Sequence, residues 1–324
     1  MTADFSVGQF AAFAAILRCP SCESRIIFER EACRCSCADC EFSRGHGFPR
    51  VAGQPILVDG KVSAVSPESL AQALGASQIR RRAPGLVDRL LDGLRLNSAH
   101  QSRCNCATFL SKLHSPTQTR PLILVIGGGV RGAGTEALYA AGTHSLLSFD
   151  IYASLDTQFV ADAHTIPLND CTVDGVWIQA VLEHVVEPVR VASEIWRVLK
   201  PEGLVYSEVP FMQQVHEGAY DFTRFTLSGH RYLFKGFEVV DAGTTGGAGT
   251  QLLWAIDHFV QAVTRNRSLG KAVKLAFLWL TWFDLVSSRA HSQDAASGTY
   301  VLGRKVASAI THKDIVRFYS GAGR

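Results

Sequence analysis

The sequence lacks long apolar runs, an excess of charge of either sign, and the start of a secretion signal. No stretch approaches the roughly 18 uninterrupted apolar residues of a membrane-spanning helix. The net charge of +3 argues against a large nucleic-acid-binding surface, although it leaves a local one open. The first residues have neither a basic start nor an apolar core. We therefore expect a cytoplasmic protein with no strong nucleic-acid signal.

The chain does have the apolar content of a large core. Its 324 residues, 47% of them hydrophobic, leave room for an α/β domain of about 200 residues and a small companion. Composition shifts and breaks predict four parts. They are a cysteine-rich domain at 1–60, a helical linker at 61–118, an α/β domain at 119–306 with a helical insertion at about 245–298, and a C-terminal tail at 307–324.

Six of the nine cysteines lie between positions 19 and 40, where they form two Cys-x-x-Cys pairs. Each pair can aim two thiolates at one tetrahedral ion. The predicted ligands of one structural zinc ion are Cys19, Cys22, Cys37 and Cys40. Cys33 and Cys35 are spare cysteines beside the second pair, and they leave open which residues form that pair. Pairs that stay reduced and free of metal are the alternative.

Short strands are expected around residues 25–28, 48–51 and 55–58, next to these cysteines. The segments "CPSC", "CADC" and "GFPRVAGQPILV" resemble the zinc-ribbon-like domain of activator subunits of tRNA methyltransferases. The same small domain is fused in front of many bacterial methyltransferases, and the resemblance covers residues 19–59. In the linker that follows, Ser66 suits a helix N-cap, and residues 86–96 carry leucines at helical spacing.

A glycine-rich turn organises the larger domain. Five apolar residues at 122–126 predict a buried strand, and residues 135–141 can form a helix. Between them stand Gly127, Gly129 and Gly132, which let the backbone turn sharply and let a ligand approach it. The spacing also matches the fingerprint of dinucleotide-binding turns. The alternative is a glycine-rich turn that binds no ligand.

Further strands are predicted at regular intervals, at 145–149, 158–160, 173–178, 204–209, 237–240 and 299–303. An amphipathic helix at 188–199 separates two of them. Strands alternating with helices predict an α/β fold, namely a doubly wound, seven-stranded Rossmann-like sheet.

The segments "VLEHVVEPVRVASEIWRVLKPEGLV" and "FVADAHTIPL" resemble motifs of class I S-adenosylmethionine-dependent methyltransferases, of the type 11-like group. The resemblance covers about 121–241 and the late strand, and these middle segments do not fit a NAD-dependent enzyme. It implies S-adenosylmethionine as cofactor and a role for each matching residue. Gly127 and Gly129 would lie against the amino-acid portion, and Asp150 would hold the ribose hydroxyls. Asp162 and Ala163 would lie beside adenine, and Gln179 and Ala180 would line the methionine end.

One position departs from the family pattern. Many members have an acid where this chain has Val125, and that acid helps to organise the ammonium end of the cofactor. Its absence leaves three interpretations: weaker binding, a substitute carboxylate, or a relative without catalytic activity. The neighbouring Glu183 and His184 are either a catalytic pair or residues that hold local structure.

The loop at 210–226 follows a predicted strand at its carboxyl end, where open α/β sheets place their active sites. It resembles the "PF…VH…YDF.R.T" stretch of methyltransferases associated with bacterial cell-surface polysaccharide biosynthesis. We predict His216 as the general base, Asp221 as its partner or replacement, and Tyr220 and Arg224 as substrate-binding residues. A structural knot of Tyr220, Asp221 and Arg224 is the alternative.

The insertion is unusually apolar between residues 250 and 286 and has basic residues nearby. A lid, a dimer surface and a peripheral membrane contact all fit it, with burial in a lid or dimer favoured. The predicted function is methyl transfer to a small-molecule or saccharide acceptor, with cell-surface polysaccharide biosynthesis as its setting. The rivals are an RNA or protein methyltransferase that uses the ribbon as an adaptor, and a cofactor-binding protein without catalysis.

Overall fold

The computed structural model describes residues 13–29, 32–44, 47–72, 96–113, 120–140 and 142–323. The predicted helix at 86–96 falls almost wholly outside these residues. One large mixed sheet dominates the structure, in the order β10-β11-β9-β8-β5-β6-β7-β4-β3. Its strands are β3 (Arg50–Val51), β4 (Gln54–Leu57), β5 (Leu122–Ile126), β6 (Ser145–Asp150), β7 (Phe159–Ala161), β8 (Val173–Gln179), β9 (Leu199–Pro210), β10 (Phe237–Thr245) and β11 (Gly298–Lys305).

The seven predicted strands form one continuous stretch of this sheet, from β7 to β10. Strands β7, β6, β5, β8 and β9 run parallel, and β11 lies antiparallel between β9 and β10. Burial along β8 does not alternate, as expected of a strand covered on both faces. The mixed α/β fold predicted from the sequence is confirmed.

The sheet has two strands more than predicted, and both come from the cysteine-rich end of the chain. Strand β4 pairs in parallel with β7 through Ile56 and Leu57, and β3 pairs with β4. Side chains at Ile56, Leu57 and Val58 are fully buried, so this strand is covered on both faces. The N-terminal residues thus extend the main sheet and share its core.

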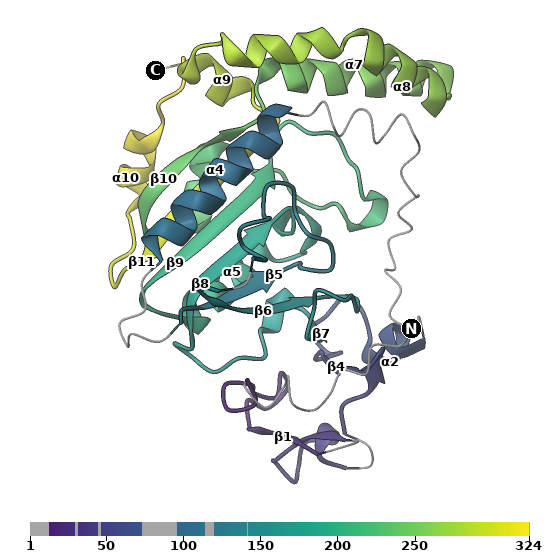
Figure 1. Ribbon diagram of the computed structural model, residues 1–324, viewed down its shortest axis with the longest axis vertical. Helices are drawn as coiled ribbons and strands as arrows, with labels where there is room; N and C mark the ends of the chain where they lie inside the picture. Colours follow the sequence, from purple (N-terminus) through teal and green to yellow (C-terminus); the bar gives the residue numbers. More distant parts are fainter. Residues whose placement is uncertain are drawn as a thin grey trace.

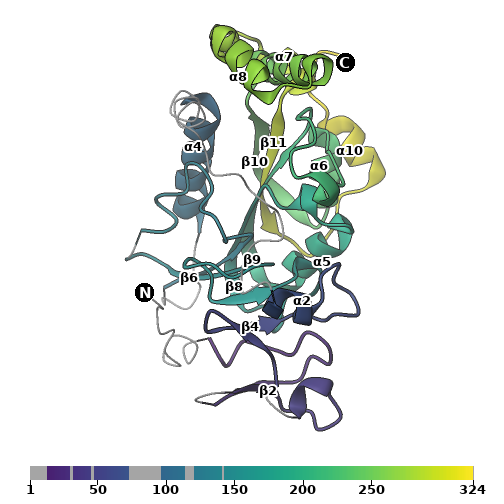
Figure 2. The same cartoon turned by 90° about the vertical axis from the view of Figure 1, so that its right-hand side faces the viewer.

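Helices cover both faces of the sheet (Figures 1 and 2). Helix α5 (Pro188–Val198) packs with Val191, Ile195 and Val198 buried on one face, where α6 (Leu227–Leu233) also lies. Helix α4 (Leu96–Lys112) covers the other face, with the ring of Phe109 edge-on to Trp177 at 5.5 Å. The shorter helices are α2 (Pro67–Gln72), α9 (Arg289–Ala295) and α10 (His312–Phe318).

The helix predicted at 135–141 does not form; the described residues there make turns. Gly134 and Gly142 take positive φ angles of 80° and 135° and bracket the segment. A segment this short cannot offset the cost of helix nucleation without strong caps. Leu138 instead packs into the core beneath α4, beside Cys106 and Phe109.

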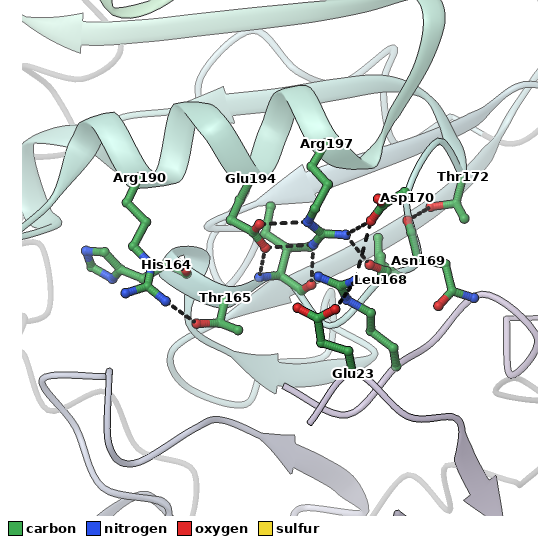
Figure 3. A network of polar contacts seen from close by, with 12 residues as sticks. Glu23, His164, Thr165, Leu168, Asn169, Asp170, Thr172, Arg190, Glu194 and Arg197 are labelled. Carbon is green, nitrogen blue, oxygen red and sulfur yellow. Dashed lines mark hydrogen bonds and ion pairs between the residues drawn. The ribbon is translucent and has the colours of Figure 1, made fainter. Parts of the chain in front are cut away.

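The N-terminal unit consists of a hairpin, β1 (Ile26–Phe28) with β2 (Cys33–Cys35), and the short helix η1 (Glu41–Ser43). It packs on the loop before β8. There Leu17 forms an isolated antiparallel β-bridge with Leu168, and the amide of Arg18 donates a hydrogen bond to the carbonyl of Pro167. A polar network reinforces this contact (Figure 3). In it, Arg18 and Arg197 of α5 both approach the carboxylate of Asp170, at 3.4 and 2.8 Å.

The insertion lies between β10 and β11. It is built from α7 (Ala248–Thr264), α8 (Arg267–Ala276) and the 3-10 helix η5 (Leu278–Leu285). Figures 1 and 2 show α7 and α8 at one end of the molecule and the N-terminal hairpin at the other. In the part of the chain that the structure describes, no helix has both the length and the apolar character to cross a membrane.

Candidate functional site

A cavity of about 370 Å³ lies at the carboxyl ends of β5, β6, β7 and β8. Its volume is within the range of small-molecule sites, roughly 300–1,000 Å³. Seven of the sequence-predicted residues line it: Gly127, Asp150, Asp162, Ala163, Gln179, Ala180 and Tyr220. The predicted residues Gly129, His216, Asp221 and Arg224 are not among its lining residues.

The glycine turn forms one wall of this cavity. Gly127 has a φ of 79°, and a Cβ there would lie 2.2 Å from Val181. The amides of Gly127 and Gly128 both donate to the carbonyl of Phe149, which holds the turn over the end of β6. A side chain at Gly127 or Gly128 would displace the turn from its place over the end of β6, so the close contact between the two backbones requires glycine.

Asp150 ends β6 with its carboxylate held by backbone amides. Its Oδ2 accepts from the Gly129 amide at 2.8 Å and its Oδ1 accepts from the Ile151 amide at 2.6 Å. Gly129 does not line the cavity itself, but its amide orients Asp150, which does. A carboxylate is the kind of acceptor that a ligand hydroxyl requires.

Asp162 follows β7 and is nearly buried. Its Oδ1 accepts from the amide of His164 at 2.8 Å, with Nδ1 of the same ring 2.6 Å away, and its Oδ2 accepts from Ser63 at 2.5 Å. Burial raises the pKa of Asp162, but the bonds from His164 and Ser63 outweigh burial and leave that pKa below its usual value. An ionised acceptor therefore faces the cavity at this end.

Three residues of the N-terminal region, Ala64, Val65 and Leu70, also line the cavity, and sequence reasoning missed them. They follow β4, whose place beside β7 brings them over the end of the sheet. The available signal was the unbroken apolar run at 55–58, which is typical of a strand inside a sheet rather than at the surface of a ribbon.

Glu208, at the end of β9, is the carboxylate that the sequence could not place. It lines the cavity and accepts hydrogen bonds from Tyr206 at 2.6 Å, Ser102 at 3.0 Å and Gln179 at 3.3 Å. Burial raises the pKa of Glu208, and these donors only partly oppose the rise. Val125, where the family often has an acid, is buried under α4.

The loop after β9 is held by an ion pair between Asp221 and Arg224. All five N–H groups of Arg224 donate hydrogen bonds, two of them to Asp221 and the others to the carbonyls of Gln213, Gln214 and Thr223. Burial raises the pKa of Asp221, but Arg224 and the amide of His216 hold that pKa well below its usual range. These bonds fix the loop's shape.

Two histidines lie beside that loop with their ring centroids 5.0 Å apart. His184 lines the cavity, and its Nδ1 lies 2.7 Å from the carbonyl of Tyr220, while Nδ1 of His216 lies 3.3 Å from Asp221. Burial lowers the pKa of both rings, so both are neutral near pH 7. Next to His184, burial raises the pKa of Glu183 to about 8, and its Oε2 has no hydrogen-bond partner among the residues that the structure describes.

The cysteine cluster differs from the prediction in one ligand. The sulfurs of Cys19, Cys22, Cys35 and Cys40 lie within 4.8 Å of one another, so Cys35 takes the place predicted for Cys37. Strand β2 ends at Cys35 and turns its side chain inward, whereas Cys37 donates its backbone amide to the sulfur of Cys35 at 3.4 Å. The separations of 3.3 Å for Cys22 and Cys35 and 3.7 Å for Cys19 and Cys40 approach the roughly 3.8 Å between sulfurs on one tetrahedral zinc.

Comparison with known proteins gives one family match and several structural likenesses. Residues 124–207 match the family model described as a methyltransferase domain. No curated protein matches the sequence.

Three solved structures illustrate the likenesses. A complex of the Haloferax volcanii Trm112 methyltransferase activator with a putative methyltransferase is 17% identical, with 69% of this chain and 94% of that chain covered and a TM-score of 0.41. An S-adenosylmethionine-dependent methyltransferase from Archaeoglobus fulgidus is 14% identical, with 67% and 99% covered and a TM-score of 0.42. Phosphoethanolamine N-methyltransferase 2 of Haemonchus contortus, in complex with S-adenosylmethionine, is 15% identical, with 62% and 52% covered and a TM-score of 0.40.

At these identities and TM-scores the structural likenesses carry no conclusion about substrate or partner. The family match covers the glycine turn, Asp150, Asp162 and the end of β8, which together form most of the cavity. Residues 124–207 therefore belong to the methyltransferase domain family, and the protein is an S-adenosylmethionine-dependent methyltransferase.

Proposed function

We propose that the cavity binds S-adenosylmethionine and that the protein transfers its methyl group to a hydroxyl of a small molecule, with a saccharide as the leading class. The supporting observation is that six of the seven predicted cofactor residues, all except Gly129, converge on one cavity at the carboxyl edge of the sheet although they are distant in sequence. Open α/β sheets bind ligands at this edge.

The proposed orientation follows from the acceptors in the cavity wall. Asp150, its carboxylate already oriented by two amides, suits the ribose hydroxyls. Asp162 and Ala163 suit the adenine end. Gln179 and Ala180 lie at the opposite end with Glu208, which supplies the carboxylate that Val125 does not. A substitute carboxylate thus accounts for the departure at Val125 without a loss of catalysis.

The acceptor is proposed to enter beside Tyr220 and the two histidines. The sulfonium is already a strong methyl donor, so the protein mainly aligns the acceptor oxygen and takes up its proton. We propose His216 as the base, because Asp221 lies 3.3 Å from its Nδ1 and leaves Nε2 for the substrate. Asp221, with its low pKa, orients this ring, and Arg224 positions the loop. His184 is the rival base because it borders the cavity.

We further propose a structural zinc ion at Cys19, Cys22, Cys35 and Cys40. Four thiols leave no open position for catalysis, and their separations suit a tetrahedral ion. The ion would hold the N-terminal unit together, since a unit of this size has little core of its own. We also propose that the protein is cytoplasmic, where a reducing environment would keep these cysteines available to bind the ion.

The experiment that tests the function has two stages. Calorimetry on the zinc-loaded protein should show binding of S-adenosylmethionine and S-adenosylhomocysteine and no binding of NAD. A panel of sugar and other small hydroxyl acceptors is then assayed with methyl-labelled cofactor. Failure of the first stage would reject the site, whereas transfer only to RNA or protein would reject the acceptor class.

A further inference from the structure

The insertion exposes a set of apolar side chains on α7 and around η5, here called the insertion face. On α7, Leu252, Ile256, Phe259 and Val263 follow the helical spacing i, i+4, i+7 and i+11, and Phe259 and Val263 are 68% and 67% exposed. On and beside η5, the exposed apolar side chains include Phe277, Trp279, Trp282, Phe283, Leu285 and Val286. Apolar side chains gathered in this number mark a contact surface.

Polar contacts inside the insertion hold its helices together. Asp284 accepts from the amides of Gly249 and Thr250 at the start of α7. Asp257, buried between the helices, lies 3.7 Å from the ammonium of Lys274 on α8. The insertion face is therefore the exposed part of a helical unit that is already packed, and not an unfilled part of its own core.

The charges around this face have one sign. Between positions 245 and 293 the only acidic residues are Asp257 and Asp284, and both are used inside the unit. Arg265 and Arg267 are exposed at the turn from α7 to α8. Exposed aromatic rings beside exposed basic side chains are typical of helices that lie in the interface of an anionic bilayer.

We propose that the insertion face binds the surface of a membrane that contains anionic lipids. The charge argues for lipid over a second copy of the chain, because Arg265 and Arg267 are exposed while the nearby carboxylates, Asp257 and Asp284, are used inside the insertion, so the same segment of a copy would offer these arginines no exposed acidic partner. The location fits as well, since both views place α7 and α8 at an end of the molecule, away from the N-terminal unit (Figures 1 and 2).

The test is co-sedimentation of the full-length protein with vesicles. Vesicles of phosphatidylcholine mixed with phosphatidylglycerol should bind the protein, vesicles of phosphatidylcholine alone should bind it weakly, and salt should reduce binding. The double variant Phe259→Ser with Trp282→Ser should lower binding roughly tenfold or more, because two aromatic side chains no longer leave water. Arg265→Glu with Arg267→Glu should remove the preference for phosphatidylglycerol.

The matched control is Val316→Ser, which removes an exposed apolar side chain from α10, outside the insertion. It should bind vesicles as the parent does, and circular dichroism melts should show that all variants fold. The proposal is overturned if the folded parent does not bind anionic vesicles, or if Val316→Ser weakens binding as much as the double variant. A dimer in sedimentation velocity that Phe259→Ser dissolves, without vesicle binding, would assign the face to a second copy instead.

Discussion

Ser63 donates a hydrogen bond to Asp162 at 2.5 Å, across 99 positions of the sequence. Ser63 belongs to the loop after β4, and Asp162 follows the neighbouring strand β7. The bond joins the N-terminal region to the acid proposed to lie at the adenine end. Ala64 and Val65, next in the chain, line the same cavity. The loop after β4, and not the N-terminal unit itself, is therefore structurally part of the site.

Loss of zinc should weaken cofactor binding, because the N-terminal unit packs on the loop before β8 and leads into β4, the strand that carries Ser63 to Asp162. Cys35→Ser removes one of the four clustered thiols and should lower both zinc content and S-adenosylmethionine affinity, the latter several-fold. Cys37→Ser is the matched control and should keep both. Elemental analysis gives the zinc content and calorimetry the affinity. Zinc lost in Cys37→Ser but kept in Cys35→Ser would reverse the assignment.

Asp150→Ala should weaken S-adenosylmethionine binding by roughly 1–3 kcal/mol, because it removes the oriented acceptor proposed for the ribose and leaves the Gly129 amide without its partner. Asp314→Ala, on α10 and outside the cavity, removes only the exposed capping contacts with Thr311 and should change the affinity little. Calorimetry on both variants measures the difference. Equal affinities for the parent and Asp150→Ala would take Asp150 out of the site.

His216→Ala should lower turnover about 10²–10⁴-fold while cofactor affinity stays near that of the parent. Partial burial lowers the pKa of His216 below its ordinary value, so the neutral base persists to lower pH than in a free histidine. Activity should fall as the pH drops through that lowered pKa, and the variant should lose this acidic limb. If His184→Ala abolishes the limb and His216→Ala leaves it intact, His184 is the base.

His230 should make the fold sensitive to acid. It is buried between Ser207 and Thr299, at 2.8 and 3.1 Å, and burial lowers its pKa to about 3. The unfolded chain binds a proton near pH 6.5 and the folded one does not, so stability is lost as the pH falls below that value. The slope from this site is about 1.4 kcal/mol per pH unit down to about pH 3.

Urea unfolding at a series of pH values measures the acid sensitivity of His230. His230→Gln can keep hydrogen bonds to the two hydroxyls, so it should unfold with a shallower dependence on pH than the parent. His258→Gln, on the exposed side of α7, is the control and should follow the parent curve. Identical slopes in all three proteins would show that His230 does not govern acid unfolding.

The sequence by itself determined the elements whose reason is local. A buried apolar strand at 122–126 followed by glycines predicts a ligand-binding turn, and Asp150 and Asp162 each end a strand that can be recognised from its own residues. Parallel neighbours bring such strand ends to one edge, so most of the cavity could be assigned without coordinates. The histidines and acids of the loop after β9 could be listed, but their roles could not be ranked.

Only the tertiary structure decided the features that depend on distant partners. Cys35 replaces Cys37 because the pairing of β1 with β2 sets which sulfur points inward. Residues 54–57 belong to the main sheet because β7 offers them an open edge, and this pairing carries Ser63 to Asp162. Glu208 reaches the cavity because β9 pairs in parallel with β8 and sets it opposite Gln179. Helix α4 then brings Ser102 to the same carboxylate. The pattern of residues along a segment reports its own periodicity, but it does not record which edge, hairpin register or side chain it will meet.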